Sequence, residues 1–155
     1  MLLLMGSVAV AQNYPPVGAA AGKLLFESNK CFDCHRVGAK GSRQGPDLSE
    51  IGMFRTTDQL RRAIVSPDDE VLPENRQVRV VTKDGATVVG RLLNHDTFTI
   101  QLIDAQDQLR SYVKANLREH TILEKGLMPS YQGKLDAQQV VDIVRYLETL
   151  TGDEK

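Results

Sequence analysis

The sequence has almost no net charge, only two cysteines and no long hydrophobic run. A formal net charge of −1 over 155 residues carries no signature of nucleic-acid or membrane-surface binding. The two cysteines do not complete a compact zinc site, because the next histidines, His95 and His120, lie roughly sixty or more residues beyond them. The apolar run at residues 1–11 is too short to span a bilayer. We therefore expect neither a nucleic-acid partner nor a stable membrane span.

Aromatic residues are also scarce. The chain has no tryptophan, and aromatic residues make up 5% of it, so few large rings are available to fill a core. Hydrophobic residues nonetheless reach 41% and charged residues 25%, which is ordinary for a soluble globular protein. The length predicts one domain, or one domain with a sizeable insert.

The most informative stretch is Cys31-Phe32-Asp33-Cys34-His35. Two thiols three residues apart, followed directly by a histidine, form the pattern that attaches c-type haem. On one helical turn Cys31 and Cys34 lie on the same side, so each reaches one vinyl group of the same porphyrin. His35 can then place its imidazole on the iron as the proximal ligand. A haem would also supply the large flat apolar body that the scarce aromatics do not.

A thioredoxin-like redox pair is the main alternative interpretation of the two cysteines. It requires a βαβ context, which is absent around residue 31. A coincidental occurrence of the pattern stays open until the rest of the chain is considered.

Residues 1–11 end in Ala9-Val10-Ala11 and have the hydrophobic region and cleavage site of a secretory signal. Gln12 is then the expected mature N-terminus, and residues 12–18 form an extended leader. The positively charged start of such a signal is missing, so either the start codon is placed too late or the signal is atypical. Export agrees with haem attachment, which takes place outside the cytoplasm in bacteria. We therefore expect a periplasmic or otherwise exported protein.

Helices are predicted on both sides of a central region rich in β-branched residues. The first is expected over residues 19–30. Thr56–Gln59 is a capping signal for a short helix that runs to about Val65. Asp136 and Gln139 form a second capping box, and the apolar residues after it recur at helical spacing.

The central region, from Arg76 to Val113, predicts an antiparallel meander of three or four strands. Lys83-Asp84-Gly85 is a hairpin signal within it. Residues 97–103 alternate between apolar and polar, which predicts a strand with Phe98, Ile100 and Leu102 on one face. Residues 114–126 are expected to form a loop.

Several short motifs together resemble those of class I monohaem cytochromes c, in particular the bacterial type fused to or encoded beside membrane-associated dehydrogenases. The motifs are Gly22-Lys-Leu-Leu-Phe26, Cys31-x-x-Cys34-His35, Gly45-Pro46-Asp47-Leu48, Leu127-Met128-Pro129 and Tyr146-Leu147. The resemblance covers about residues 19–66 and 117–151. It implies a mainly α fold, with three to four helices around one covalent haem c, in a domain over residues 19–151.

The resemblance also implies two further roles at the haem. Met128 would be the distal iron ligand, and the Pro46 carbonyl would accept the His35 Nδ1 proton. His35 and Met128 are 93 residues apart, which is longer than small cytochromes of this class usually show. Without the strand-rich region the separation would be ordinary. The competing sixth ligands are His95, His120 and Met53.

The strand-rich region is interpreted as an inserted antiparallel β meander at about residues 76–113, which departs from the minimal pattern of the family. It resembles a variant of the dehydrogenase-associated cytochromes, in which Asp84-Gly85 is followed by Gly90-Arg91. The insert either shields the haem from water or offers a sheet edge to a partner.

These features predict an electron carrier rather than an enzyme, with one haem cycling between Fe(II) and Fe(III) under His35 and Met128 ligation. Two alternatives stay open. One is a haem-based enzyme or gas sensor with a displaceable sixth ligand, and the other is a fixed haem subunit of a dehydrogenase or respiratory complex. Basic residues outnumber acidic ones between Lys30 and Arg62. They are either ordinary surface charges or a rim that steers an acidic redox partner protein.

Overall fold

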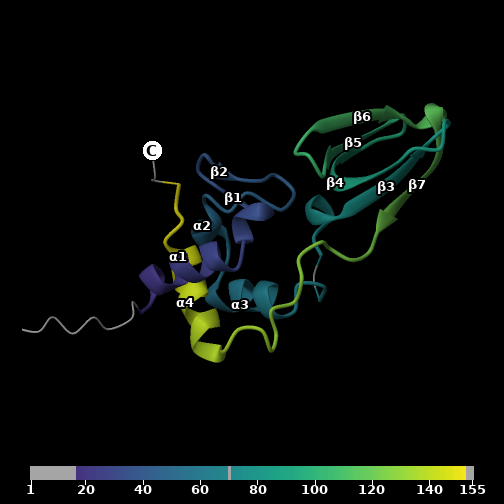
Figure 1. Ribbon diagram of the computed structural model, residues 1–155. Coiled ribbons are helices and arrows are strands. Elements are labelled where there is room, and N and C mark those ends of the chain that lie inside the picture. Colours follow the sequence, from purple (N-terminus) through teal and green to yellow (C-terminus); the bar gives the residue numbers. More distant parts are fainter. Residues whose placement is uncertain (1–16, 70, 153–155) are drawn as a thin grey trace, which may run out of the picture.

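The computed structural model describes residues 17–69 and 71–152, which form a helical part and a five-stranded sheet (Figure 1). The expected signal segment, Gln12 and most of the expected leader lie outside the described residues. In chain order the elements are α1 (Ala19–Ser28), the 3₁₀ turn η1 (Cys31–Asp33), β1 (Arg36–Val37), β2 (Lys40–Gly41), α2 (Ile51–Phe54), α3 (Thr57–Val65), the 3₁₀ turn η2 (Pro73–Asn75), β3 (Gln77–Thr82), β4 (Thr87–His95), β5 (Thr99–Asp104), β6 (Leu109–Val113), the 3₁₀ turn η3 (Lys114–Asn116), β7 (Leu117–Leu123) and α4 (Ala137–Glu148).

Helices α1 and α4 cross at close range because a glycine lies at the crossing. A Cβ atom on Gly22 would lie 1.9 Å from the carbonyl oxygen of Asp142, so only glycine allows this approach. Next to the crossing, the Phe26 and Tyr146 rings pack edge to face with their centroids 5.5 Å apart. Helix α4 also packs against α2 and α3, which gives the helical part a hydrophobic core of its own.

Helices α3 and α4 begin where the sequence predicts. The Thr56 hydroxyl accepts a hydrogen bond from the Gln59 backbone N–H, and the Gln59 side chain accepts one from the Thr56 N–H. Asp136 and Gln139 form the same reciprocal pair at the start of α4. Both predicted capping boxes are thus confirmed, since a cap depends on residues only three positions apart.

Strands β3 to β7 form one antiparallel, curled sheet in the order β6-β5-β4-β3-β7. Its inner face is a second core, in which four side chains are fully buried: Val78, Val80, Ile100 and Leu102. Phe98, expected on the same face as Ile100, instead lies in the turn before β5 and is 74% exposed. The turn comes later than expected because β4 continues to His95, through an irregularity in its pairing with β5 between Leu92 and Asn94.

Strand β7 occupies part of the segment that was expected to be a loop. It pairs with β3 along the edge of the sheet. Most of its side chains are exposed, so its sequence lacks the alternation that marks a half-buried strand. Its partner lies far earlier in the chain, and a local pattern does not reveal such a pairing.

The expectation of a mainly α fold is wrong. Helix accounts for 33% of the structure and strand for 30%, with four helices and a five-stranded antiparallel sheet among the described residues. The error arose because the motifs of the resemblance lie in the helical part, whereas the strands pair with each other around a separate core. In residues 17–69 and 71–152, no helix is long and apolar enough to cross a membrane.

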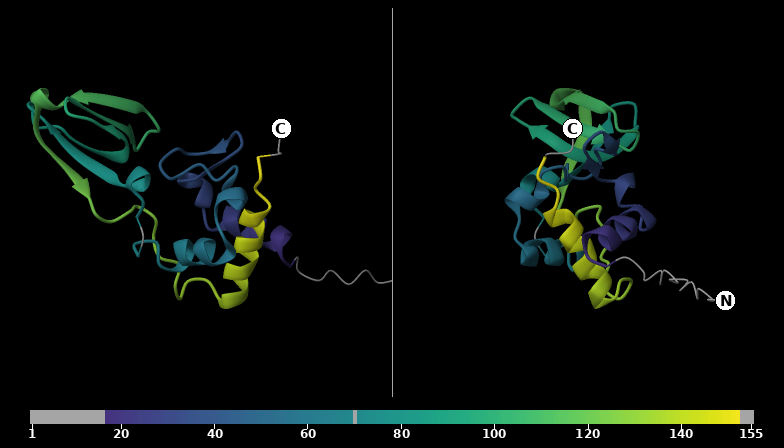
Figure 2. Two further views of the ribbon diagram at one scale, coloured as in Figure 1. Left: turned by 180° about the vertical axis from the view of Figure 1, so that it is seen from behind. Right: turned by 90° about the vertical axis from the view of Figure 1, so that its left-hand side faces the viewer.

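The sheet touches the helical part at the loop that follows β2 (Figure 2). The Asp107 carboxylate, in the turn between β5 and β6, accepts hydrogen bonds from the Ser42 hydroxyl (2.8 Å) and the Arg43 backbone N–H (3.0 Å). Arg91 on β4 donates from its Nε to the Arg43 carbonyl at 2.8 Å. The Gln44 side-chain amide also donates to a carbonyl of this turn. These bonds hold one turn of the sheet against the loop that runs from the cysteine motif to Pro46.

Candidate functional site

The cysteine motif follows directly after α1. Lys30 adopts a left-handed conformation with a φ of 59°, which separates α1 from the 3₁₀ turn η1. Residues three apart eclipse each other in a 3₁₀ turn, so Cys31 and Cys34 stand on the same side of the backbone. The Cys31 carbonyl accepts hydrogen bonds from the N–H groups of Cys34 (3.2 Å) and His35 (2.8 Å). Both cysteines are free thiols.

The His35 side chain is buried and its orientation is fixed by the chain. Its Nδ1 lies 3.0 Å from the Pro46 carbonyl oxygen. Because a carbonyl only accepts, Nδ1 carries the proton and Nε2 keeps its lone pair for a metal. Burial lowers the pKa of His35, and the hydrogen bond to Pro46 partly opposes this, so the ring is neutral at neutral pH. Gly45 lies against the ring, where a Cβ atom would be 2.9 Å from Nδ1.

Both thiols are held in the protonated form at neutral pH. Burial raises the pKa of Cys31 to about 11, against the opposing effect of a hydrogen bond with Tyr131. Burial also raises the pKa of Cys34, and the negative charges of Asp33 and Asp107 add to the shift. A redox-active cysteine pair needs a lowered thiol pKa. The surroundings of these two thiols therefore disfavour the redox-disulfide interpretation.

Met128 lies in the segment between β7 and α4. Hydrogen bonds join this segment to the ends of α3 and α1. The Tyr131 N–H donates to the Ile64 carbonyl in the last turn of α3 at 3.1 Å. The Tyr131 hydroxyl donates to the Asn29 carbonyl, just after α1, at 3.3 Å. Met128 thereby lines a cleft together with Cys31, Tyr131 and His35. The remaining walls of this cleft are largely apolar and include Phe26, Leu48, Ile64, Ile143 and Leu147.

The proposed alternatives for the sixth iron ligand lie away from this cleft. Met53 is on α2 with 62% of its surface exposed. His95 and His120 are exposed on the sheet, where their ring centroids are 5.9 Å apart. None of the three lines the cleft, whereas Cys31, His35 and Met128 all do, with Pro46 directly behind His35. Cys34 is partly buried one turn from Cys31 and does not line the cleft itself.

Two residues of the site received no role from the sequence. Tyr131 bonds both Asn29 and the Cys31 thiol, and only its position three residues after Met128 could have pointed to it. Gly45 belongs to the Gly-Pro-Asp-Leu motif, but its close approach to the His35 ring is a contact between side chain and backbone that the sequence does not reveal. Among the described residues, no group of three or more His, Cys, Asp or Glu side chains is placed to hold a metal ion.

These residues fit a covalently attached haem. Cys31 and Cys34 offer two free thiols on one side of one turn, and His35 offers a neutral imidazole with an unprotonated nitrogen. The Met128 side chain reaches the same cleft from a different part of the chain, and the apolar walls suit a porphyrin body.

Comparison with known families identifies the chain. The family model described as cytochrome c matches residues 19–96, which include Cys31, Cys34, His35 and Pro46 but not Met128. No curated protein sequence matches the chain. The match extends over half of the sequence, and it coincides with the motif and histidine geometry described above. The chain therefore belongs to the cytochrome c family, whose members bind covalent haem c and generally carry electrons.

Proposed function

We propose that this chain is an exported carrier of single electrons in which His35 and Met128 would both bind the iron of one haem. Cys31 and Cys34 hold the haem through thioether bonds. The single observation that carries the ligand assignment is that His35 and Met128, far apart in sequence, line the same apolar cleft with Cys31. The competing ligands His95, His120 and Met53 lie outside it.

Each residue has a distinct task in this mechanism. Bound haem c supplies one-electron chemistry between Fe(II) and Fe(III). His35 presents Nε2 in a fixed direction because Nδ1 is bonded to the Pro46 carbonyl. Met128 would supply a neutral sulfur, a ligand that favours the ferrous state and so would raise the reduction potential. The apolar walls keep water away from both ligands.

The location and partners are proposed on other grounds. The apolar segment at residues 1–11 supports export, as does the chemistry of haem attachment. A redox partner follows from membership of the family, and the excess of basic residues between Lys30 and Arg62 supports an acidic docking surface on that partner. The dehydrogenase-associated type rests on Asp84-Gly85 and Gly90-Arg91 in the strand-rich region.

The test of ligation is the Met128→Ala variant of the haem-loaded, full-length protein. We expect the weak long-wavelength sulfur-to-iron band of the ferric form to disappear, because no other sulfur lines the cleft apart from the anchoring cysteine. The ferrous variant should bind carbon monoxide, whereas the wild-type protein should not.

Three matched controls accompany this variant. Met53→Ala, His95→Ala and His120→Ala each remove an alternative ligand from an exposed position and should leave the band and the carbon monoxide response unchanged. An unchanged spectrum in Met128→Ala would rule out Met128 as a ligand. Carbon monoxide binding by the wild-type protein would instead favour a gas sensor or haem enzyme with a displaceable ligand.

A further inference from the structure

Two histidines lie close together on the sheet, away from the haem cleft. His95 is the last residue of β4 and His120 lies on β7, and their ring centroids are 5.9 Å apart. The two strands are not neighbours, because β3 lies between them in the sheet. The approach of the two rings therefore depends on the curl of the sheet (Figure 1).

The register of the strands places both side chains on the inner face of the sheet. His95 is paired with Ile100, and His120 is paired with Val80. Directly paired residues of antiparallel strands point to the same face. Ile100 and Val80 are fully buried in the core of the inner face, so both histidines point to that side.

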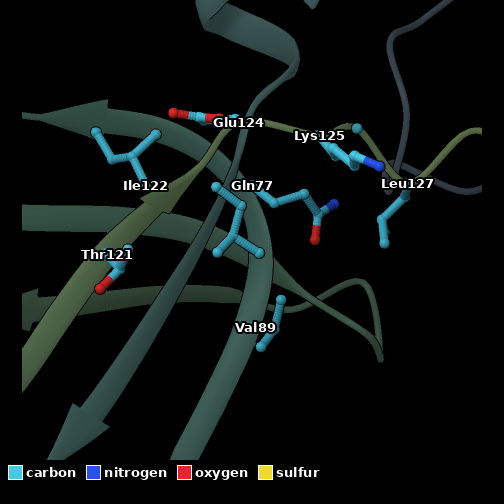
Figure 3. Close-up of a pocket in the computed structure, with 9 residues that line it drawn as sticks. Gln77, Val89, Thr121, Ile122, Glu124, Lys125 and Leu127 are labelled. Carbon is cyan, nitrogen blue, oxygen red and sulfur yellow. The ribbon is translucent and has the colours of Figure 1, made fainter. Parts of the chain in front are cut away.

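The outer face of the sheet agrees with this assignment. Gln77, Val89 and Thr121 border an open depression there (Figure 3). Successive residues of a strand point to opposite faces, so His120 points away from the depression that Thr121 borders. His95 and His120 are nevertheless both exposed, so the pair lies at a part of the inner face that solvent reaches.

The turn after β4 fixes the backbone next to His95. The Asp96 carboxylate accepts hydrogen bonds from the backbone N–H groups of Phe98 and Thr99 and from the Thr99 hydroxyl, each at 2.7 Å. A site whose backbone is already ordered loses less conformational entropy when a ligand binds. The His95 side chain therefore starts from a fixed point opposite β7.

The distance between the rings suits an ion that is held by one nitrogen of each. Zinc binds an imidazole nitrogen at about 2.0–2.1 Å, so two imidazoles on one ion have their centroids about 5–6 Å apart. The ring planes are inclined by 50°, so the two rings are not stacked on each other. Rotation of a histidine ring about its second side-chain torsion is soft, so a nitrogen of each ring can turn toward a common point.

The charges around the pair are balanced. Partial desolvation lowers the pKa of His95, the Lys114 ammonium and the His120 ring add to the shift, and the Asp96 carboxylate opposes it. The Lys114 ammonium also donates a hydrogen bond to the Asp96 carbonyl, so it has a partner of its own. One positive and one negative side chain beside the rings leave room for a cation.

We propose that His95 and His120 together bind one divalent transition-metal ion of the class that prefers imidazole ligands, such as Zn²⁺ or Cu²⁺. With two protein ligands, the ion keeps further coordination positions for water, so it exchanges readily. The ion joins β4 to β7 and thereby stabilises the curl of the sheet. Binding does not depend on which side chains ligate the haem iron.

The test is a calorimetric titration of the haem-loaded, full-length protein without a histidine tag. Zn²⁺ is the probe because it has no redox chemistry, and Mg²⁺, which prefers oxygen ligands, is the matched control. We expect one Zn²⁺ to bind per chain and Mg²⁺ not to bind. The third histidine of the sequence, His35, is buried and does not compete.

Variants then show whether both rings hold the same ion. His95→Phe and His120→Phe each keep a ring but remove its nitrogens, and each should weaken Zn²⁺ binding at least about ten-fold, or about 1.4 kcal/mol. The double variant should lose hardly more than either single variant, because each change already destroys the shared site. Asn94→Ala changes the exposed residue next to His95 and should retain binding. Circular dichroism shows whether each variant is folded.

Thermal unfolding gives a second measurement. An ion that binds only the folded chain raises its denaturation midpoint. Zn²⁺ should therefore raise the midpoint of the wild-type protein and of Asn94→Ala, but not the midpoints of His95→Phe and His120→Phe.

Three results would overturn the proposal. Absence of Zn²⁺ binding to the folded wild-type protein would mean that the two rings do not form a site. Losses that add up in the double variant would mean two separate weak sites. Zn²⁺ binding that survives both histidine changes, or equal binding of Mg²⁺, would place the ion on other groups. None of these results affects the assignment of His35 and Met128.

Discussion

His35 uses its two ring nitrogens differently, and neighbouring residues enforce the difference. Nδ1 is bonded to the Pro46 carbonyl at 3.0 Å, which leaves the Nε2 lone pair available to a metal, as the proposed ligation requires. Gly45 lies so close to the ring that even one methyl group does not fit beside it. The Gly45 N–H also donates to the Cys34 carbonyl at 2.7 Å. Gly45 and Pro46, which are adjacent in the chain, therefore position both Cys34 and His35.

Gly45→Ala should therefore disturb the position of the His35 ring, the proposed proximal ligand. The added Cβ would lie 2.9 Å from His35 Nδ1, so the ring or the loop must move and the bond to Pro46 should weaken. We expect a loss of about 1–3 kcal/mol in the free energy of unfolding, the usual cost of overpacking. Denaturant titration of the haem-loaded protein measures this, and its reduction potential should change in parallel.

Gly126→Ala is the matched control for this change. Gly126 lies in the segment before Met128, but an added Cβ there would meet no atom closer than 3.8 Å. Its free energy of unfolding should stay close to that of the wild-type protein. Equal losses in the two variants would mean that glycine flexibility, rather than contact with His35, explains the effect.

The turn between β5 and β6 is the element that joins the sheet to the cysteine motif. Its shape depends on Asp104, whose carboxylate accepts hydrogen bonds from Arg110 Nε (2.6 Å) and from the backbone N–H groups of Gln106 and Gln108 (both 2.9 Å). The bond from Arg110 is the largest cause of the lowered pKa of Asp104. Asp107, in the same turn, then bonds the loop after β2.

The pH dependence of stability should reveal the role of Asp104. Because folding lowers its pKa below the ordinary value of 3.8, its contribution is complete above that value and is lost as the pH falls through the folded-state pKa. Asp104→Asn should therefore lower the denaturation midpoint at pH 7, and the difference from wild type should shrink below about pH 4. Thermal unfolding across this pH range measures it.

Asp69→Asn, at an exposed position outside the sheet, is the control and should leave the midpoint unchanged. A difference between Asp104→Asn and wild type that persists undiminished into acid would show that the Asn side chain fails for steric reasons and that the carboxylate charge is not involved.

The elements differ in how far the sequence predicts them. The starts of α3 and α4 follow from capping boxes, in which the two paired residues are only three positions apart, so the signal is local. Strand β7 does not, because it is an exposed edge strand whose partner β3 lies far away in the chain. The burial of Gln77 is similarly hidden from the sequence: a glutamine in a strand is usually exposed, yet this one is only 2% exposed.

At the site, the motif Cys31-x-x-Cys34-His35 was sufficient to predict haem attachment, because the chemistry depends on five consecutive residues. The placement of Met128 in the same cleft depends instead on the bonds of Tyr131 to the ends of α1 and α3. The sequence alone does not reveal contacts between such distant segments, so the role of Met128 was inferred from the resemblance to cytochromes c.

On the scale of the whole molecule, the helical part and the sheet have separate hydrophobic cores. Two neighbouring chain segments join them, one that leads into β3 and one that follows β7. Gln77 and Leu123, at the start of β3 and the end of β7, are paired residues in neighbouring strands. The connecting segments also touch, since the Gly126 N–H donates to the Asp68 carboxylate at 3.3 Å. We therefore expect that a short linker can replace the sheet without displacing the segments on either side.

Replacing residues 77–123 with a short Gly/Ser linker should leave haem attachment intact and lower the reduction potential. The sheet contacts the loop next to the cysteine motif, and its removal should admit water near the haem, which stabilises the more highly charged ferric state. We expect a decrease of tens of millivolts, where about 59 mV corresponds to a ten-fold change in the equilibrium of a one-electron couple. Redox titration measures it.

The same linker variant distinguishes the two possible roles of the sheet, which are shielding the haem from water and docking to a redox partner. If the potential stays constant while electron exchange with the native partner is lost, the sheet is a docking surface and the shielding account is wrong. If haem attachment itself fails, the two parts do not fold separately.

The most direct test of the central claim, iron ligation by His35 and Met128, is the proton NMR spectrum of the ferrous protein with isotope-labelled methionine methyl groups. The sequence has four methionines, so the spectrum is simple. A methyl group on a sulfur bound to iron lies over the porphyrin ring, and the ring current shifts its signal far upfield. We predict one such signal, lost in Met128→Leu and retained in Met53→Leu. Ordinary positions for all the methionine methyl signals, or an upfield signal that survives Met128→Leu, would contradict the account.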